Sequence, residues 1–229
     1  MARQQKRLTR KEIKEDKVTE FFLAVAQYTR EHSRRIWGAA LVVIIIAGVS
    51  MLVIRQRRGA ELEAQGMLAN ANLYLKDGNY SGALSGYANV MERFRGTWSY
   101  SDATFLSGAA SFDAGRYDSA MVFFQSYLDQ KKRRDIFNVS AQLGVAQCLE
   151  ELGKYSDAAD NYLKVQREHP DDPIAPDALF GAARCYQNAG DLKQAESAYQ
   201  DLVTRYPQSR QANLAKMPLL EIQAKLENT

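Results

Sequence analysis

The 229-residue chain has few residues that carry metal or redox chemistry, with two cysteines and two histidines. A structural zinc site usually takes four ligands of these types, and a disulfide scaffold takes more cysteines, so neither can be the basis of the fold. The chain also holds only five prolines and fourteen glycines. Because these residues interrupt helices, their scarcity favours an all-α fold.

The patterns of an active site are missing as well. His32 and His169 have no neighbouring serine, cysteine or carboxylate pattern that would make a nucleophile or a metal centre. The glycines follow neither of the phosphate-loop spacings GxGxxG and GxxxxGK. The sequence therefore predicts a protein that is not an enzyme and that has no cofactor, metal or small-molecule substrate.

Charge is unevenly distributed along the chain. Residues 1–35 hold ten Lys and Arg against five Asp and Glu, whereas residues 55–229 hold twenty against twenty-two. Because the large part carries no basic excess, we expect no binding of nucleic acid. The basic run at residues 131–134 is expected to close a helix as a solvated linker, with an anionic partner as the alternative.

Residues 36–54, from Ile36 to Ile54, carry no charge at all. As a helix they would extend about 28 Å, close to the roughly 30 Å hydrocarbon core of a bilayer. Trp37 stands where an interfacial aromatic is expected, and arginines flank both ends, namely Arg34, Arg35, Arg55, Arg57 and Arg58. The sequence predicts a single-pass transmembrane helix that anchors the chain in the lipid bilayer.

The excess of Lys and Arg before this segment predicts that the N-terminal tail faces the cytoplasm, although the five residues on each side disagree mildly. Within the tail, residues 11–35 have the pattern of an amphipathic juxtamembrane helix, with a solvated helix as the alternative. The expected domains are a basic tail at 1–35, the anchor at 36–54 and a helical domain at 59–229.

The helical domain contains four similar blocks that begin at Gly78, Gly115, Gly153 and Gly190. Two positions after each glycine stands an aromatic or a leucine, and five positions after it an alanine: Tyr80, Ala83, Tyr117, Ala120, Tyr155, Ala158, Leu192 and Ala195. An aromatic follows at nine, namely Tyr87, Phe124, Tyr162 and Tyr199. Glycine permits a turn, alanine a close helix crossing, and the rings fill the space between helix pairs. Each block is therefore predicted to be a helix pair.

These blocks resemble tetratricopeptide repeats, over about residues 60–208, with Pro170 and Pro207 at the place of that family's closing proline. The resemblance implies an all-α solenoid of about four helical hairpins. Residues 211–226 would add a capping helix, with Leu214, Met217, Leu220 and Leu226 available to cover the last pair.

The complete arrangement of tail, anchor and repeats resembles the ancillary subunit of the bacterial Sec translocon, and the repeats are similar to those of the cell-division coordinator family. The resemblance implies a single-pass protein of the bacterial inner membrane with a periplasmic repeat domain. Its implied partners are translocon subunits, periplasmic chaperones or exported polypeptides.

The first helix of each pair carries a row of side chains suited to binding a peptide. We name as the first-helix row the residues Leu68, Asn72, Phe105, Phe112, Leu143, Gln147, Phe180 and Arg184. The alternative is that its apolar members pack between adjacent pairs. Cys148 and Cys185 are interpreted as small core residues.

The sequence thus predicts a membrane-anchored scaffold that assists protein translocation or envelope assembly. Two alternatives are an oligomeric assembly factor of the envelope and an adaptor whose repeats face the cytoplasm.

Overall fold

The computed structural model describes residues 19–25, 27, 30, 33–131 and 133–227. These residues form α-helices and one short 3-10 turn, and none of them lies in a strand. The chain divides into two units, Met1–Gln56 and Arg57–Thr229. The all-α prediction is therefore confirmed.

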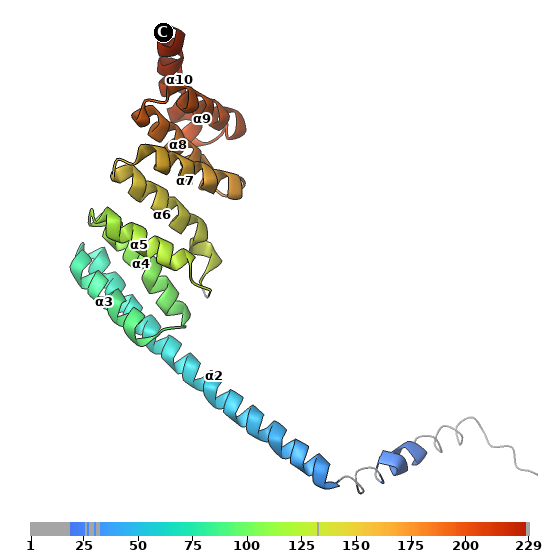
Figure 1. Cartoon of the computed structure of the whole chain (residues 1–229). Helices are drawn as coiled ribbons and strands as arrows, with labels where there is room; N and C mark the ends of the chain where they lie inside the picture. Colours follow the sequence, from blue (N-terminus) through green and yellow to red (C-terminus); the bar gives the residue numbers. More distant parts are fainter. Residues whose placement is uncertain (1–18, 26, 28–29, 31–32, 132, 228–229) are drawn as a thin grey trace, which may run out of the picture. The chain divides into compact units, whose positions relative to one another are not determined.

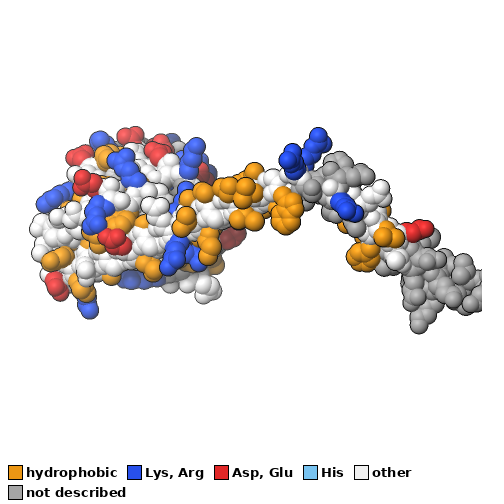
Figure 2. Space-filling view, turned by 90° about the horizontal axis from the view of Figure 1, so that it is seen from below, with side chains coloured by type: hydrophobic (Ala, Val, Ile, Leu, Met, Phe, Trp, Pro, Cys, Tyr) orange, Lys and Arg blue, Asp and Glu red, His pale blue; other side chains and the backbone are white. Residues whose placement is uncertain are grey.

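The first unit contains the predicted anchor, residues 36–54. Helix α2 (Ser33–Lys76) begins there, and from Trp37 onward it is long and apolar enough to be a candidate transmembrane span. Its large apolar side chains are exposed between residues 37 and 54, and on the face shown in Figure 2 they form an orange stretch with Lys and Arg at both ends. Residues 19–25 of the predicted juxtamembrane helix are helical, whereas residues 11–18, 26, 28–29 and 31–32 of that segment lie outside the described residues.

The second unit consists of helices that stack in chain order (Figure 1). After the C-terminal part of α2 come α3 (Tyr80–Arg93), α4 (Trp98–Asp113), α5 (Tyr117–Leu128), η1 (Asp135–Phe137), α6 (Asn138–Glu151), α7 (Tyr155–Glu168), α8 (Ala175–Ala189), α9 (Leu192–Arg205) and α10 (Arg210–Glu227). The end of α2 and helices α4, α6 and α8 are the first helices of the four pairs, and α3, α5, α7 and α9 are the second helices. The predicted helix pairs are thus present.

The four block glycines form the turns inside the pairs. Gly78, Gly115, Gly153 and Gly190 have φ angles of 72°, 71°, 71° and 83°. Glycine adopts this left-handed region readily because it has no Cβ, whereas most other residues do so at a steric cost. The aromatic or leucine two positions later is the first residue of the second helix in every pair.

Small residues set the distance between the helices of a pair. Ala83, Ala120, Ala158 and Ala195 are completely buried on the second helices. The Phe124 ring lies against two glycines, where an added Cβ would come within 2.7 Å of it at Gly108 on α4 and 2.6 Å at Gly144 on α6. Glycine is therefore required on both sides of this ring.

The last helix, α10, contradicts the predicted capping register. Its buried residues are Ala212, Ala215, Leu219 and Ile222, which belong to the same apolar cluster as α9. Leu214, Met217 and Leu220 are instead 50%, 65% and 60% exposed, and only Leu226 packs partly against the cluster. The reason is steric, because α10 approaches α9 closely through Ala212 and Ala215, and the side of the helix that carries these alanines leaves Leu214, Met217 and Leu220 facing outward.

The basic run also differs from its prediction. Helix α5 ends at Leu128, so the run does not close that helix but follows it as part of the connection to η1. Arg134 Nε lies 2.9 Å from both carboxylate oxygens of Asp102, and Arg133 donates to Asn138 and to the Gln130 carbonyl oxygen at 2.7 Å each. The side chains of these two arginines therefore form hydrogen bonds within the chain, while Lys132 lies outside the described residues.

Candidate protein-binding surface

Each first helix has two faces that are covered by neighbouring helices and a third face that is left open to solvent. On α8, Ala178, Ala182 and Cys185 share an apolar cluster with α7, whereas Leu179 and Ala183 share one with α9. Phe180 and Arg184 lie between these two faces and remain half-buried and exposed, respectively. The same two positions on the other first helices carry Leu68, Asn72, Phe105, Leu143 and Gln147, and the last member of the row, Phe112, stands three positions before Gly115.

Most of this row is half-buried. Asn72 and Arg184 are exposed, and the other six members have intermediate exposure. Phe112 packs edge-to-face on Tyr117 with the ring centroids 5.3 Å apart, and Phe180 packs in the same way on Tyr199 at 5.8 Å. Leu68 and Leu143 pack at the edges of apolar clusters. The apolar members thus contact the core with one side and solvent with the other.

Phe105 is the member most enclosed by other rings. It stacks on Phe137 with centroids 4.6 Å apart and an interplanar angle of 10°, and it lies 5.7 Å from Phe124 and 5.6 Å from Tyr127. Phe137 comes from η1, the turn that precedes α6. At this point the row is part of a four-ring cluster that joins the second and third pairs.

The row is polar where α6 and α8 meet. Arg184 donates from Nε and Nη2 to the two carboxylate oxygens of Glu150 at 2.7 and 2.8 Å. Tyr162 donates its hydroxyl to the same carboxylate at 2.8 Å. The hydrogen bonds to Glu150 raise the pKa of Arg184, and burial followed by the charge of Glu150 raises the pKa of Tyr162.

The sequence analysis did not predict that the ring nine positions after each glycine can also form a hydrogen bond. Three of these rings are tyrosines whose hydroxyls donate to polar side chains of their own first helix. The acceptors are Asn72 for Tyr87 at 2.6 Å, Glu150 for Tyr162 at 2.8 Å and Gln187 for Tyr199 at 3.2 Å. In the second block the ring is Phe124, and the two positions that supply the acceptors elsewhere, six and three before the glycine, are the apolar Ala109 and Phe112. The tyrosine and its polar acceptor are thus absent together from the second block, and this shared difference is a sequence signal from which the hydrogen bonds could have been predicted.

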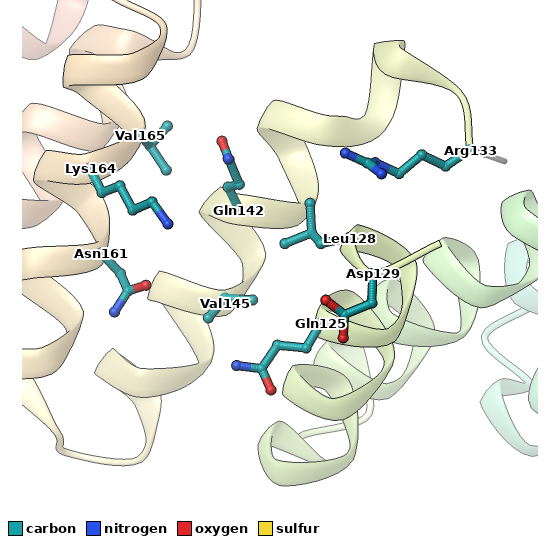
Figure 3. Close-up of a pocket in the computed structure, with 9 residues that line it drawn as sticks. All are labelled: Gln125, Leu128, Asp129, Arg133, Gln142, Val145, Asn161, Lys164 and Val165. Carbon is teal, nitrogen blue, oxygen red and sulfur yellow. The ribbon is translucent and has the colours of Figure 1, made fainter. Parts of the chain in front are cut away.

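A separate pocket of about 570 Å³ lies between the second and third pairs (Figure 3). Its lining is apolar at Leu128, Val145 and Val165 and otherwise polar: Gln125, Asp129, Arg133, Gln142, Asn161 and Lys164. It contains no member of the first-helix row. In the next pair the position of Gln125 is taken by Leu163, which packs into two apolar clusters. A polar side chain thus lines this pocket where the next pair has an apolar one.

The two cysteines lie inside the same stack. Cys148 and Cys185 are free thiols with no exposed surface, and burial raises the pKa of each to about 12. The prediction that both are core residues is confirmed. Over the described part of the chain, no three His, Cys, Asp or Glu side chains form a group that could hold a metal ion.

Comparison with solved structures shows the same fold in several proteins. A tetratricopeptide repeat protein from Parabacteroides merdae matches with a TM-score of 0.59 and 15% identity, over 72% of this chain and 61% of its own. YrrB, a tetratricopeptide repeat protein with an unusual peptide-binding site, matches with a TM-score of 0.54 and 17% identity, over 67% of this chain and 74% of its own. MamA from Desulfovibrio magneticus RS-1 matches with a TM-score of 0.54 and 15% identity, over 72% of this chain and 96% of its own.

Comparison with family models gives the same answer from sequence, whereas no curated protein sequence matches the chain significantly. Tetratricopeptide repeat models match residues 68–135, 133–173 and 177–209. Together these segments cover more than half of the chain and include all four block glycines. The chain belongs to the tetratricopeptide repeat family, whose members are scaffolds for interactions between proteins.

Proposed function

We propose that this protein is anchored in a membrane by residues 36–54 and binds other proteins through the first-helix row. One observation carries the membrane part, namely the exposure of the apolar stretch of α2. Trp37, Ile44 and Leu52 are 75%, 66% and 69% exposed. Because exposed apolar surface costs about 25 cal/mol per Å² in water, nineteen consecutive uncharged residues favour a lipid environment.

The repeat domain then faces the periplasm of a bacterial cell, with the basic tail in the cytoplasm. The charge bias of the tail supports this orientation. A repeat domain held at the outer face of the inner membrane lies where exported chains emerge. Assistance in protein translocation or envelope assembly is the function that this location favours.

The binding surface combines apolar side chains with hydrogen-bonding groups that are already fixed. Phe180 lies beside Arg184, whose guanidinium is 5.8 Å from its ring centroid. A peptide in extended or helical form would place its apolar side chains on such rings and its polar groups on the flanking amides and charges. The peptide-binding site of the similar protein YrrB supports a peptide as the ligand class. Segments of translocon subunits, chaperones or exported polypeptides are the proposed ligands.

Protease digestion of intact spheroplasts tests the topology. Added protease should degrade residues 59–229 while a tag at the N-terminus survives. Survival of the repeat domain until the membrane is opened would instead favour the adaptor with cytoplasmic repeats.

Site-specific photo-crosslinking in cells tests the binding surface. A crosslinker at Gln147, in the row, should form adducts with other proteins, whereas one at the exposed Lys193 on α9 serves as the control. Equal adducts at both positions would contradict binding at the row, and mass spectrometry of the adducts would identify the partner.

A further inference from the structure

Helix α10 presents an apolar stripe that the described part of the chain does not cover. The terminal stripe consists of Leu214, Met217 and Leu220, which are 50%, 65% and 60% exposed. These residues are three positions apart and therefore lie along one side of the helix. Exposed apolar side chains that are contiguous in this way mark an interaction surface more often than isolated ones do.

The repeat itself shows what such a stripe contacts. Residues that are 34 positions apart in the sequence occupy equivalent places in α8 and α10. The buried face of α8 against α7 consists of Ala178, Gly181 and Cys185. Its counterpart is the buried face of α10 against α9, which consists of Ala212, Ala215 and Leu219. The same spacing takes Ala183 and Tyr186 to Met217 and Leu220. Ala183 and Tyr186 pack against α9, the second helix of their own pair. The terminal stripe thus corresponds to a face that receives a helix, α9, in the fourth pair.

We infer that this face receives the α10 helix of a second copy of the chain, in antiparallel orientation. Charge complementarity argues for this occupant. The N-terminal half of α10 carries Arg210 and Lys216 and no acidic residue, whereas the C-terminal half carries Glu221 and Glu227 beside Lys225. An antiparallel pair places the basic half of each helix against the acidic half of the other, and a parallel pair would place like charges together.

The register follows from the stripe. With Met217 opposite Met217 of the second copy, Leu214 lies opposite Leu220 at both ends of the contact. Lys216 of each copy is then within one helical turn of Glu221 of the other. The contact is isologous, as in a twofold dimer, and it needs no conformational change in either chain.

The contact is small, which decides how it should be measured. A pair of helices touching through three side chains each buries less than the roughly 1,200–2,000 Å² of a stable interface. The pair is therefore weak at the dilution of chromatography, and covalent trapping is the suitable assay. The two native thiols do not interfere because they have no exposed surface.

The experiment is disulfide trapping of full-length Met217→Cys in intact cells under mild oxidation, read on a non-reducing gel. We expect a species of twice the 25.8 kDa chain mass. Val122→Cys is the matched control, because Val122 is 61% exposed on α5, away from the terminal stripe. If the cysteine disturbs the helix, co-expressed Leu214→Cys and Leu220→Cys chains give the same readout, since the proposed register brings these two positions together.

Charge reversal distinguishes a specific antiparallel contact between two α10 helices from disulfides that form by random collision. In the Met217→Cys chain, Lys216→Glu should reduce trapping several-fold, and adding Glu221→Lys should restore it. Trapping no greater than that of Val122→Cys, adducts only of another mass, or a double reversal that fails to restore trapping would each overturn the inference. None of these outcomes bears on the first-helix row, so the proposed function is tested separately.

Discussion

Arg184 on α8 binds Glu150 on α6 through two hydrogen bonds of 2.7 and 2.8 Å, across the boundary between the third and fourth helix pairs. The Glu150 side chain is only 12% exposed, and Tyr162 on the intervening helix α7 donates to the same carboxylate. One carboxylate therefore joins three consecutive helices. Because the acceptor is nearly buried, this contact stabilises the stack more than a surface ion pair does.

Arg184→Ala should lower the free energy of unfolding by about 1–2 kcal/mol, because Glu150 loses two of its donors. The exposure of the arginine to solvent weakens the interaction and is already included in this value. The measurement is chemical denaturation of the full-length chain in detergent, followed by circular dichroism. Arg205→Ala is the control, because Arg205 and Asp201 form a pair that is more than half exposed on both sides. Its removal should cost less than about 0.5 kcal/mol. Equal losses in the two variants would contradict the joining role of Glu150.

Gly144→Ala should destabilise the protein, although alanine is the better helix former. The added Cβ would lie 2.6 Å from the Phe124 ring, which Gly108 holds on its other side. Overpacking of this kind costs about 1–3 kcal/mol and exceeds the gain of up to about 1 kcal/mol in helix propensity.

Gly66→Ala is the matched control for that prediction. Gly66 also lies inside a helix, α2, but an added Cβ there would meet no atom within 4 Å. The substitution should raise the free energy of unfolding by about 0.5–1 kcal/mol. Thermal melting of both variants should show shifts of opposite sign, and a shift of the same sign would mean that Phe124 can move aside.

The helix pairs were predictable because a short-range rule specifies them. A glycine at a left-handed turn, an alanine five positions later and a ring nine positions later each reflect a contact within one pair, and each recurs with a period of about 37 residues. Gly144 and Gly181 escaped prediction because they contact the ring of the preceding pair, at Phe124 and Tyr162. Contacts between pairs involve separate blocks, so the pattern within one block does not reveal them.

The register of α10 was not predictable from hydrophobicity alone. A helix rich in leucine is expected to bury its largest apolar residues, yet α10 buries Ala212 and Ala215 together with Leu219 and Ile222. Close packing against α9 selects the side with small residues. The stacking of Phe137 on Phe105 was equally hidden, since the two rings come from different blocks and meet only through the connection after α5.

Phe105→Ala should cost about 2–4 kcal/mol of stability, because it removes the ring that joins Phe124, Tyr127 and Phe137. Ile136→Ala is the neighbouring control, since Ile136 adjoins Phe137 in η1 and is 78% exposed. Denaturation midpoints of the two variants should differ clearly. An unchanged midpoint for Phe105→Ala, with partner crosslinking lost, would show that this ring serves binding and not the core.

Alkaline pH should destabilise the protein through its two buried thiols. Burial raises the pKa of Cys148 and of Cys185 from 9.0 to about 12 in the folded chain. The folded state therefore keeps its thiol protons at pH values where the unfolded state loses them. The stability that these protons provide is complete below pH 9 and is lost as the pH rises towards 12.

Between pH 8 and pH 10, each thiol should contribute a loss of about 1 kcal/mol to the free energy of unfolding. The buried tyrosines contribute in the same direction, so the comparison needs a variant that keeps them. Cys148→Ala/Cys185→Ala is suitable, because Ala110 already occupies the equivalent position in the second block, five residues before Gly115. Urea denaturation at both pH values should show a smaller pH-dependent loss in this variant, by about 2 kcal/mol for the pair. An identical loss with and without the cysteines would mean that the thiols titrate normally and are not enclosed by α6, α7 and α8.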